Sequence, residues 1–331
     1  CCEDGANASA CFLLFTRSMM KKQQSIYAAL LLFVLVGIAG PAIAMEGRAW
    51  GDIHVRTLDG ATYEFQAAGE YVASRSPAGD LEVQLRLEST GFSSSVSIVT
   101  AVAVQVDTSR LSVALGREPL LSVEGQPVTL EPGGGLDLPG GGRIERLAKS
   151  YEIFWSDGSN LSINVARRHL NAFLRPALTR RGALDGLFGN FNGNPMDDVD
   201  AVTAMATLGS GADSRLQPQL TELARALFLD EDDDRLVAQD TSLFEYAPGQ
   251  NTRTFRRPTP KREATAAGLP SSWRRQAEAA CRDAGVTDPE LLEACIVDVG
   301  YTRDESFAET AVLVQARSGS DLDSDARKAS R

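Results

Sequence analysis

The sequence predicts a mainly β protein, with an antiparallel β-sandwich over residues 46–200 followed by a small α-helical C-terminal segment. Residues 81–88 (LEVQLRLE) alternate apolar and polar side chains, the pattern of a strand with one face to the core and one to water. An Asp-Gly pair at 157–158 lies between two apolar and β-branched runs, which indicates a hairpin. An Asp-Pro pair at 288–289 marks the start of a helix.

The strands of the sandwich follow one another at short intervals. Residues 54–57 and 62–65 flank a tight LDGA turn, and residues 151–155 and 161–165 flank the Asp-Gly pair. Residues 96–106 form a longer β-branched run, which indicates a more buried strand. Many short strands with turns between them favour a sandwich, and about 150 residues suffice to bury a core.

The chain changes character after residue 200. Residues 201–270 are rich in small and polar side chains and predict an irregular linker. An acidic run at 230–234 could bind calcium, but adjacent like charges are more typical of a solvated stretch.

Residues 271–316 predict a helical hairpin region. Helices are expected over 273–283 and 289–299, with a third over 304–314. Residues 317–331 are polar and predict a disordered tail.

Cys281 and Cys295 lie in the first two of these helices. In an exported chain they most simply form one disulfide, which would staple a hairpin whose own core is small; two free buried thiols are the alternative. The other cysteines (Cys1, Cys2 and Cys11) lie in the first eleven residues, far from this pair in sequence.

Residues 19–44 are typical of an export signal. A Met-Met-Lys-Lys start is followed by an apolar run at 26–38 and an Ala-Ile-Ala cleavage motif. Since a bilayer span takes about 20 residues, we expect cleavage after Ala44, with an uncleaved membrane anchor as the alternative. Residues 1–18, upstream of a plausible start methionine, are interpreted as a gene-model extension and excluded from the fold.

The formal net charge of −11 narrows the classes of partner. Nucleic acids and anionic membrane surfaces both attract clustered Lys and Arg, so neither is expected as a partner once the signal is removed. An acidic chain suits a soluble exported protein or one that collects divalent cations.

Residues 186–198 (GLFGNFNGNPMDD) are the most informative stretch of the chain. Side-chain oxygens stand at five of its positions: Asn190, Asn192, Asn194, Asp197 and Asp198. Calcium takes about six to eight oxygen ligands, which a glycine-rich loop of this kind can wrap around one point. The alternative is a plain turn whose Asn side chains cap their own backbone. The loop is not an EF-hand, because Ala201 stands where a bidentate Glu would be required.

Motifs at both ends of this region resemble a von Willebrand factor type D domain. That family opens with a GDPH-like element, a T-F-D-G turn and a Y-x-F strand, to which GDIH at 51–54, TLDG at 57–60 and YEF at 63–65 are similar. It ends with G-L-x-G-N-x-N-G-x-x-x-D-D, which residues 186–198 resemble. The resemblance covers residues 50–199.

The resemblance implies a β-sandwich with a structural calcium ion near the join of its ends. By motif position Asp52 would be one ligand. The terminal loop would supply the others: Asn190, Asn192, Asp197, Asp198 and a main-chain carbonyl near Asn194. Carboxylates packed together without a cation repel each other, so bound calcium would stabilise the fold by linkage.

Two departures from the family pattern limit what carries over. Ala49-Trp50 and Phe188 stand where animal members hold Cys, so apolar packing replaces the disulfide frame and covalent multimers are not inferred. Ile53 replaces the proline of GDPH, so the self-cleavage of some members at their Asp-Pro bond is not expected.

The two histidines of the chain are assigned structural places. His54 is expected to be packed or hydrogen-bonded in the core rather than to bind calcium, which prefers oxygen. His169 follows Arg167-Arg168 at a strand end and is expected to face solvent.

The favoured function is a non-enzymatic, calcium-stabilised module for adhesion, matrix assembly or protein–protein interaction. Its partners would be extracellular or surface proteins or glycans, and its location would be secreted, cell-surface or periplasmic, in a bacterial protein. One alternative is a carrier of lipids or other apolar ligands, since the family also occurs in lipid-transport proteins. The other is a metal-dependent hydrolase using Asp52 and His54, which the scarcity of catalytic motifs disfavours.

Overall fold

The computed structural model of the protein describes most of the chain between residues 46 and 329. The described ranges are 46–66, 68–90, 96–195, 197–198, 242–252 and 264–329, with side chains described up to residue 319 in the last of these. The expected extension (1–18), export signal (19–44) and acidic run (230–234) lie outside the described residues.

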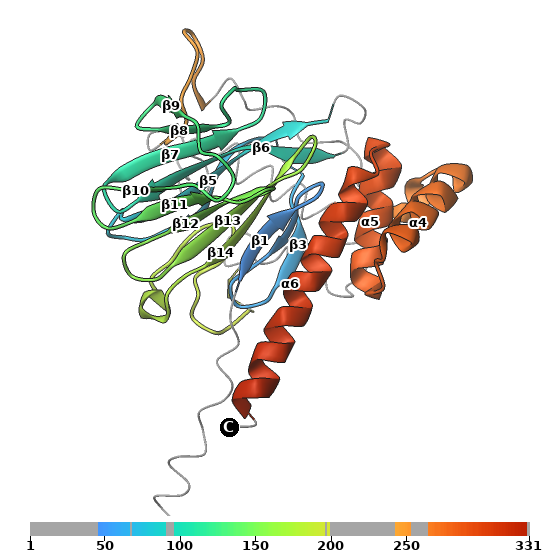
Figure 1. The fold of residues 1–331 in the computed structure, drawn as a ribbon. Helices are drawn as coiled ribbons and strands as arrows, with labels where there is room; N and C mark the ends of the chain where they lie inside the picture. Colours follow the sequence, from blue (N-terminus) through green and yellow to red (C-terminus); the bar gives the residue numbers. More distant parts are fainter. Residues whose placement is uncertain are drawn as a thin grey trace, which may run out of the picture. The chain divides into compact units, whose positions relative to one another are not determined.

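Two antiparallel sheets form the sandwich (Figure 1). An eight-stranded sheet has the order β10-β11-β12-β13-β14-β1-β2-β3, and a six-stranded sheet has the order β4-β5-β6-β7-β8-β9. The strands are β1 (Gly47–Trp50), β2 (His54–Arg56), β3 (Thr62–Glu64), β4 (Gly69–Arg75), β5 (Leu81–Ser89), β6 (Ser97–Val106), β7 (Ser109–Ala114), β8 (Leu121–Val123), β9 (Gln126–Val128), β10 (Gly135–Asp137), β11 (Arg143–Arg146), β12 (Ser150–Phe154), β13 (Asn160–Val165) and β14 (Leu170–Arg175). The prediction of a mainly β protein is confirmed, and the Asp-Gly hairpin is the β12–β13 pair.

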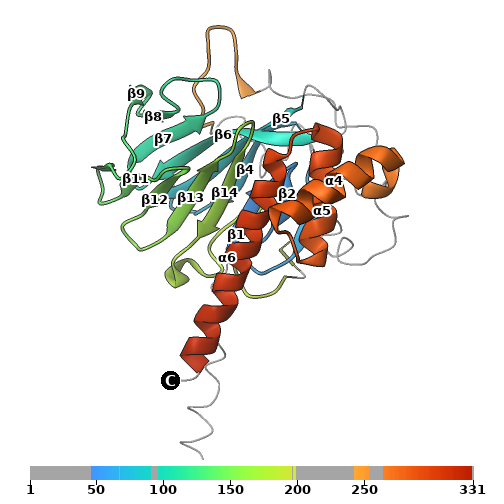
Figure 2. The ribbon, with the colours of Figure 1, turned by 45° about the vertical axis from the view of Figure 1, so that its right-hand side comes forward.

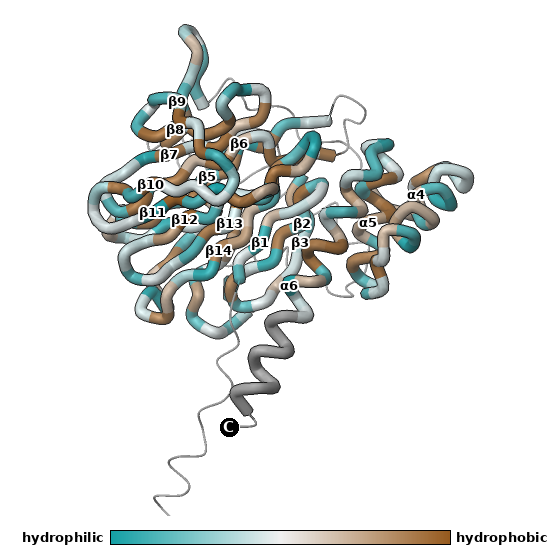
Figure 3. The backbone as a smooth tube through the Cα atoms, viewed as in Figure 1, coloured by the Kyte–Doolittle hydropathy of each residue, from teal (hydrophilic) through white to brown (hydrophobic). Residues whose placement is uncertain are grey.

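The main core lies between the two sheets. Alternate residues of β5, such as Leu81, Val83 and Leu85, point into it together with Leu161 and Ile163 of β13, and all five are fully buried. Figure 3 shows hydrophobic and hydrophilic positions interleaved along the strands, as expected where successive side chains point to opposite faces.

The polar face of β5 is covered by protein, which the sequence pattern did not predict. Glu82, Gln84 and Arg86 are all less than 10 % exposed. The segment over 242–252 lies on this face: Leu243 N–H donates to Gln84 Oε1 at 2.9 Å. Part of the expected linker is therefore packed structure without helix or strand. Alternation identifies a polar face but does not say whether water or another segment covers it.

Two aromatic rings of this covering segment enclose a buried ion pair. Arg86 Nε donates to Glu70 Oε1 at 2.7 Å, and the guanidinium lies 4.5 Å from the ring centre of Phe244 and 5.6 Å from that of Tyr246. Tyr246 Oη also donates to Glu70. A buried carboxylate is tolerable here because donors surround it and the rings stabilise the cation.

Within the described residues three α-helices follow the sandwich, which confirms the prediction of a C-terminal helical segment (Figure 2). They are α4 (Ser271–Ala284), α5 (Pro289–Thr302) and α6 (Ser306–Ala329), and short 3-10 turns occupy η1 (Leu178–Arg180) and η3 (Ala266–Gly268). No helix in the described part of the chain is long and apolar enough to cross a membrane.

Local signals fix the boundaries of α4 and α5. Gly285 ends α4 with φ of +101°, a left-handed cap, and the Asp288 side chain accepts hydrogen bonds from Glu290 N–H and Leu291 N–H at the start of α5. Cys281 and Cys295 form a disulfide that joins the two helices, which decides between the two alternatives for these cysteines.

Helix α6 runs past the point where a disordered tail was expected to begin. Arg317 donates to Glu46 at 2.7 Å and lies 4.2 Å from the ring centre of Phe173. Ser318 Oγ accepts a 2.7 Å hydrogen bond from Arg48. Tertiary contacts with β1 and β14 therefore order residues whose polar composition predicted disorder.

His169 is buried, contrary to the expectation that it faces solvent. Its ring stacks on Phe307 of α6 with centres 4.1 Å apart, and its Nε2 lies 2.9 Å from Thr310 Oγ1. Burial lowers the pKa of His169 to about 4, against a weaker raising effect of the Asp298 and Asp304 charges. A helix docked on the strand end covers the position, and sequence neighbours alone did not reveal that helix.

The buried His169 predicts a loss of stability in acid. The unfolded chain takes up a proton near pH 6.5 and the folded chain only near pH 4, so the free energy of unfolding falls across that window. Between pH 7 and pH 4.5 the loss from this group is about 2 kcal/mol. Urea unfolding at the two pH values, compared with His169→Gln, measures it. Equal losses in the two proteins would contradict the prediction.

Candidate functional site

The loop over residues 186–198 is tied by its backbone to both sheets. Leu187 N–H donates to Val72 O of β4 at 3.0 Å, and Phe188 O accepts from Leu58 N–H, just after β2, at 2.8 Å. The loop is thus held at the edge where the start and the end of the sandwich meet.

Three asparagine side chains of this loop converge on Asp197. Asn190 Nδ2 and Asn194 Nδ2 donate to its carboxylate at 3.1 and 2.9 Å, and Asn192 Nδ2 lies 3.1 and 2.9 Å from its two oxygens. These hydrogen bonds, that from Asn192 above all, lower the pKa of Asp197. The loop also caps itself, because the backbone N–H groups of Asn192 and Asn194 donate to Asn190 Oδ1 and Asn192 Oδ1.

Asp198 lies on the side of the loop that faces the end of β2. Its carboxylate accepts hydrogen bonds from Thr57 Oγ1 and from Asn190 N–H. Burial, together with the neighbouring Asp59 carboxylate, raises the pKa of Asp198 to about 6. The two carboxylates therefore repel each other unless a cation or a proton lies between them.

Asp59 belongs to this cluster and was missed by the sequence reasoning. It stands in the turn between β2 and β3, and its Oδ1 and Oδ2 accept from Gly193 N–H at 2.8 Å and Asn192 N–H at 2.9 Å. The signal was present in the TLDG turn, whose aspartate we interpreted only as a turn residue. We assigned the ligand role to Asp52 of the GDIH element instead.

Asp52 does not join the terminal loop. It lies in the hairpin before β2, whereas Thr57 and Asp59 follow that strand. Because a strand rises about 3.3 Å per residue, the two ends of β2 serve separate clusters. The structure therefore divides the predicted ligand set. Asp52 contacts His54. The other predicted residues come together in the loop: Asn190, Asn192, Asn194, Asp197 and Asp198.

The side chains around Asp197 are of the kinds that hard divalent cations bind. Three carboxylates (Asp59, Asp197 and Asp198) meet one loop, and hard cations such as calcium take oxygen ligands. The asparagine amides point their nitrogen atoms at Asp197, and a bound cation would require them to turn their oxygens inward, which gives up the backbone caps on Asn190 Oδ1 and Asn192 Oδ1.

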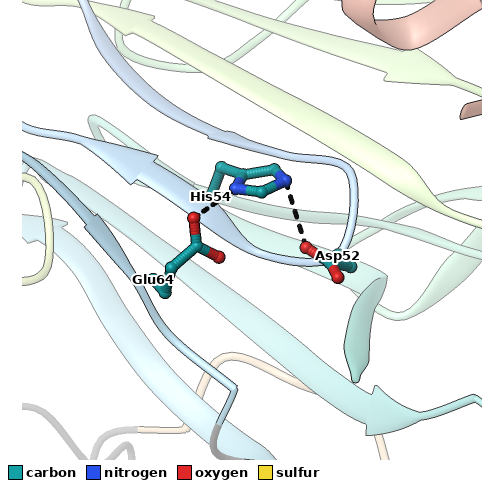
Figure 4. A group of neighbouring side chains, drawn as sticks. All are labelled: Asp52, His54 and Glu64. Atoms are coloured by element: carbon teal, nitrogen blue, oxygen red, sulfur yellow. Dashed lines mark hydrogen bonds and ion pairs between the residues drawn. The ribbon is translucent and has the colours of Figure 1, made fainter. Parts of the chain in front are cut away.

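A second polar cluster surrounds His54 at the other end of β2 (Figure 4). His54 Nδ1 lies 2.6 Å from Glu64 Oε1 on β3, its partner in the strand register. His54 Nε2 lies 2.9 Å from Asp298 Oδ1 of α5 and 3.1 Å from Asp52 Oδ1. The expected buried, hydrogen-bonded role of His54 is confirmed.

This second cluster gathers negative charge away from water. Burial, reinforced by Asp298, raises the pKa of Asp52 well above its usual range. Burial opposes protonation of His54, but the carboxylates of Glu64, Asp298 and Asp52 together raise its pKa.

The sandwich part of the chain matches one known domain family. Residues 47–201 match the family model of the von Willebrand factor type D domain. The match begins at β1 and includes the terminal loop, so it covers the sandwich and stops before the helices.

Three curated relatives illustrate the similarity. The human IgGFc-binding protein is 30 % identical over 172 residues, which is 49 % of this chain and 3 % of the relative. Pig zonadhesin is 30 % identical over 154 residues, 45 % of this chain and 6 % of the relative. Human sushi domain-containing protein 2 is 30 % identical over 166 residues, 45 % of this chain and 19 % of the relative. The chain therefore spans less than a fifth of the length of each.

Substitution of Gly189 tests the packing of the loop. A Cβ there would lie 2.1 Å from Asp198 Oδ1, and the backbone φ is +79°. Gly79→Ala is the matched control, because its φ is +71° and its Cβ would meet open space. We expect Gly189→Ala to lower the free energy of unfolding by about 1–2 kcal/mol more than the control, measured by urea titration. Equal losses would show that Asp198 is not held against Gly189.

Proposed function

We propose that this chain, which carries a von Willebrand factor type D domain over residues 47–201, is a non-enzymatic exported module for adhesion, matrix assembly or protein–protein interaction. A structural calcium ion stabilises the sandwich. The partners are extracellular or surface proteins or glycans, met in a secreted, cell-surface or periplasmic location.

The observation that carries the calcium proposal is the approach of Asp59 to the terminal loop. Its carboxylate accepts two backbone hydrogen bonds from that loop and lies beside Asp198. Asp59 takes the place first assigned to Asp52, and the other ligands are as the sequence predicted: Asn190, Asn192, Asn194, Asp197 and Asp198. Calcium bound there offsets the repulsion between carboxylates and ties the β2–β3 turn to the end of the domain.

The interaction role is supported by the relatives rather than by a surface of this chain. One of them is named for binding the Fc part of IgG. A rigid sandwich that binds another protein needs no catalytic group, and the acidic surface keeps it soluble.

The two alternative functions are less well supported by the geometry. A cavity of about 420 Å³ has charged residues (Glu88, Arg167 and Arg168) as well as apolar ones (Ile98, Leu115 and Phe307) in its walls, so it is not a purely apolar site for a lipid tail. A hydrolase using Asp52 and His54 would need substrate access, but both side chains are buried, Asp52 completely.

Calcium is expected to raise the melting temperature of the purified protein relative to a chelator. At a free concentration 100-fold above its Kd, calcium adds about 2.7 kcal/mol to the free energy of unfolding. Differential scanning calorimetry of wild type, Asp59→Asn and Asp198→Asn measures the effect, which should be lost in both variants.

Two controls make the calcium experiment specific. Asp283→Asn removes one exposed carboxylate of α4 and should retain the full response. Asp52→Asn should also retain it, because Asp52 lies at the other end of β2. An equal melting temperature of the wild type in calcium and in chelator would refute the calcium proposal. If only Asp52→Asn lost the response, Asp52 and not Asp59 would be the ligand.

Export predicts a defined new N-terminus. Expression of residues 19–331 in a secreting bacterial host should release a protein whose first residue is Met45, because the Ala-Ile-Ala motif ends at Ala44. Intact-mass measurement of the exported fraction decides the point, with Ala42→Glu and Ala44→Glu together as the uncleavable control. A mature protein that still contains residues 19–44 would support the membrane-anchor alternative.

A further inference from the structure

The cluster around His54 contains a carboxylate that hydrogen bonding does not explain. Asp52 is fully buried, and within the part of the chain that the structure describes neither of its side-chain oxygens makes a hydrogen bond of good geometry. Its Oδ1 points at His54 Nε2 from 3.1 Å (Figure 4), and Asp298 Oδ1 approaches the same nitrogen to 2.9 Å. A buried carboxylate with so few donors is unfavourable unless a proton or a cation compensates its charge.

We propose that Asp52, His54 and Asp298 form a binding site for zinc, separate from the calcium loop. An imidazole nitrogen and carboxylate oxygens are all ligand atoms that zinc accepts, whereas calcium prefers oxygen alone. Three protein ligands leave a fourth position for water. The cation offsets the charge of Asp52 more fully than the His54 ring alone does.

The distances suit a tetrahedral ion. Ligand atoms about 2.0–2.1 Å from zinc lie about 3.3 Å from one another. His54 Nε2 is 2.9 and 3.1 Å from the two carboxylate oxygens, so shifts of a few tenths of an ångström bring both of these distances to that spacing.

Glu64 orients the ring of His54 without contacting the proposed ion. Its Oε1 lies 2.6 Å from His54 Nδ1, the ring nitrogen that faces away from the proposed ion. A carboxylate in that position fixes the tautomer of a ligating histidine, so that Nδ1 carries the proton and Nε2 offers its lone pair. Glu64 is thus a positioning residue and not a ligand.

Gly51 shows that the approach of Asp298 is built into the backbone. A Cβ at Gly51 would lie 2.3 Å from Asp298 Oδ2, and the glycine has φ of +61°. Its neighbour Asp52 also donates its backbone N–H to Asp298 Oδ1 at 3.3 Å. Since Asp298 belongs to α5, zinc bound here joins the helical segment to the sandwich.

Isothermal titration of zinc into the full chain tests the proposal. The protein is first stripped with chelator and then held in excess calcium, so that the calcium loop is not available to zinc. We expect one equivalent of zinc to bind to wild type, and at least 100-fold weaker binding to Asp52→Asn and His54→Gln. Cobalt substitution should give the intense visible absorption of a tetrahedral site.

Matched variants separate the zinc site from its surroundings. His169→Gln removes the other histidine of the chain and Asp59→Asn alters the calcium loop, and both should bind zinc as wild type does. Glu64→Gln keeps the ligands, changes a half-exposed side chain and should weaken zinc binding about 10–100-fold. This variant decides the matter if the buried substitutions fail to fold.

The proposal is overturned by any of three results. These are the failure of wild type to bind zinc, undiminished binding by folded Asp52→Asn or His54→Gln, and undiminished binding by Glu64→Gln. In each case His54 serves instead as a protonated ring between carboxylates. Because calcium is present throughout, none of these results bears on the calcium site.

Discussion

The pairing of β1 with β14 is the contact on which both polar clusters depend. It sets the first strand of the sandwich beside its last, with Ala49 opposite Ala172. The β1–β2 hairpin then places β2 next in the sheet, where one end faces the terminal loop and the other faces α5. Residues from the beginning of the sandwich, from its end and from the helical segment therefore meet along the three residues of β2.

Four buried or half-buried carboxylates differ in what holds them. Glu46 is surrounded by the guanidinium groups of Arg48, Arg175 and Arg317, and Glu70 has Arg86. Asp198 instead accepts hydrogen bonds from neutral donors, and Asp52 lies beside the ring of His54 and a second carboxylate, that of Asp298. Arginine therefore neutralises Glu46 and Glu70, whereas the charges of Asp198 and Asp52 face neutral donors and an imidazole ring.

Local patterns predicted the elements well and the contacts between them less well. The strand alternation at 81–88 and the cap at Asp288 depend on neighbours in sequence, and both features are present in the structure. The burial of His169 and the covered face of β5 depend on segments far away in the chain, which no periodicity encodes. In the candidate site, composition located the terminal loop, but only the fold distinguishes Asp59 from Asp52. Both aspartates flank the same strand, and its direction decides which one reaches the loop.

The cover that residues 242–252 place over the six-stranded sheet bears on where an autonomous fragment can end. Phe244 packs on the small side chains Ala101 and Ala103 of β6, a strip that would otherwise meet water. A fragment cut at the boundary of the family match, at residue 201, would lose that ring and the aromatic enclosure of Arg86. The smallest piece with a closed surface is therefore longer than the stretch shared with other proteins.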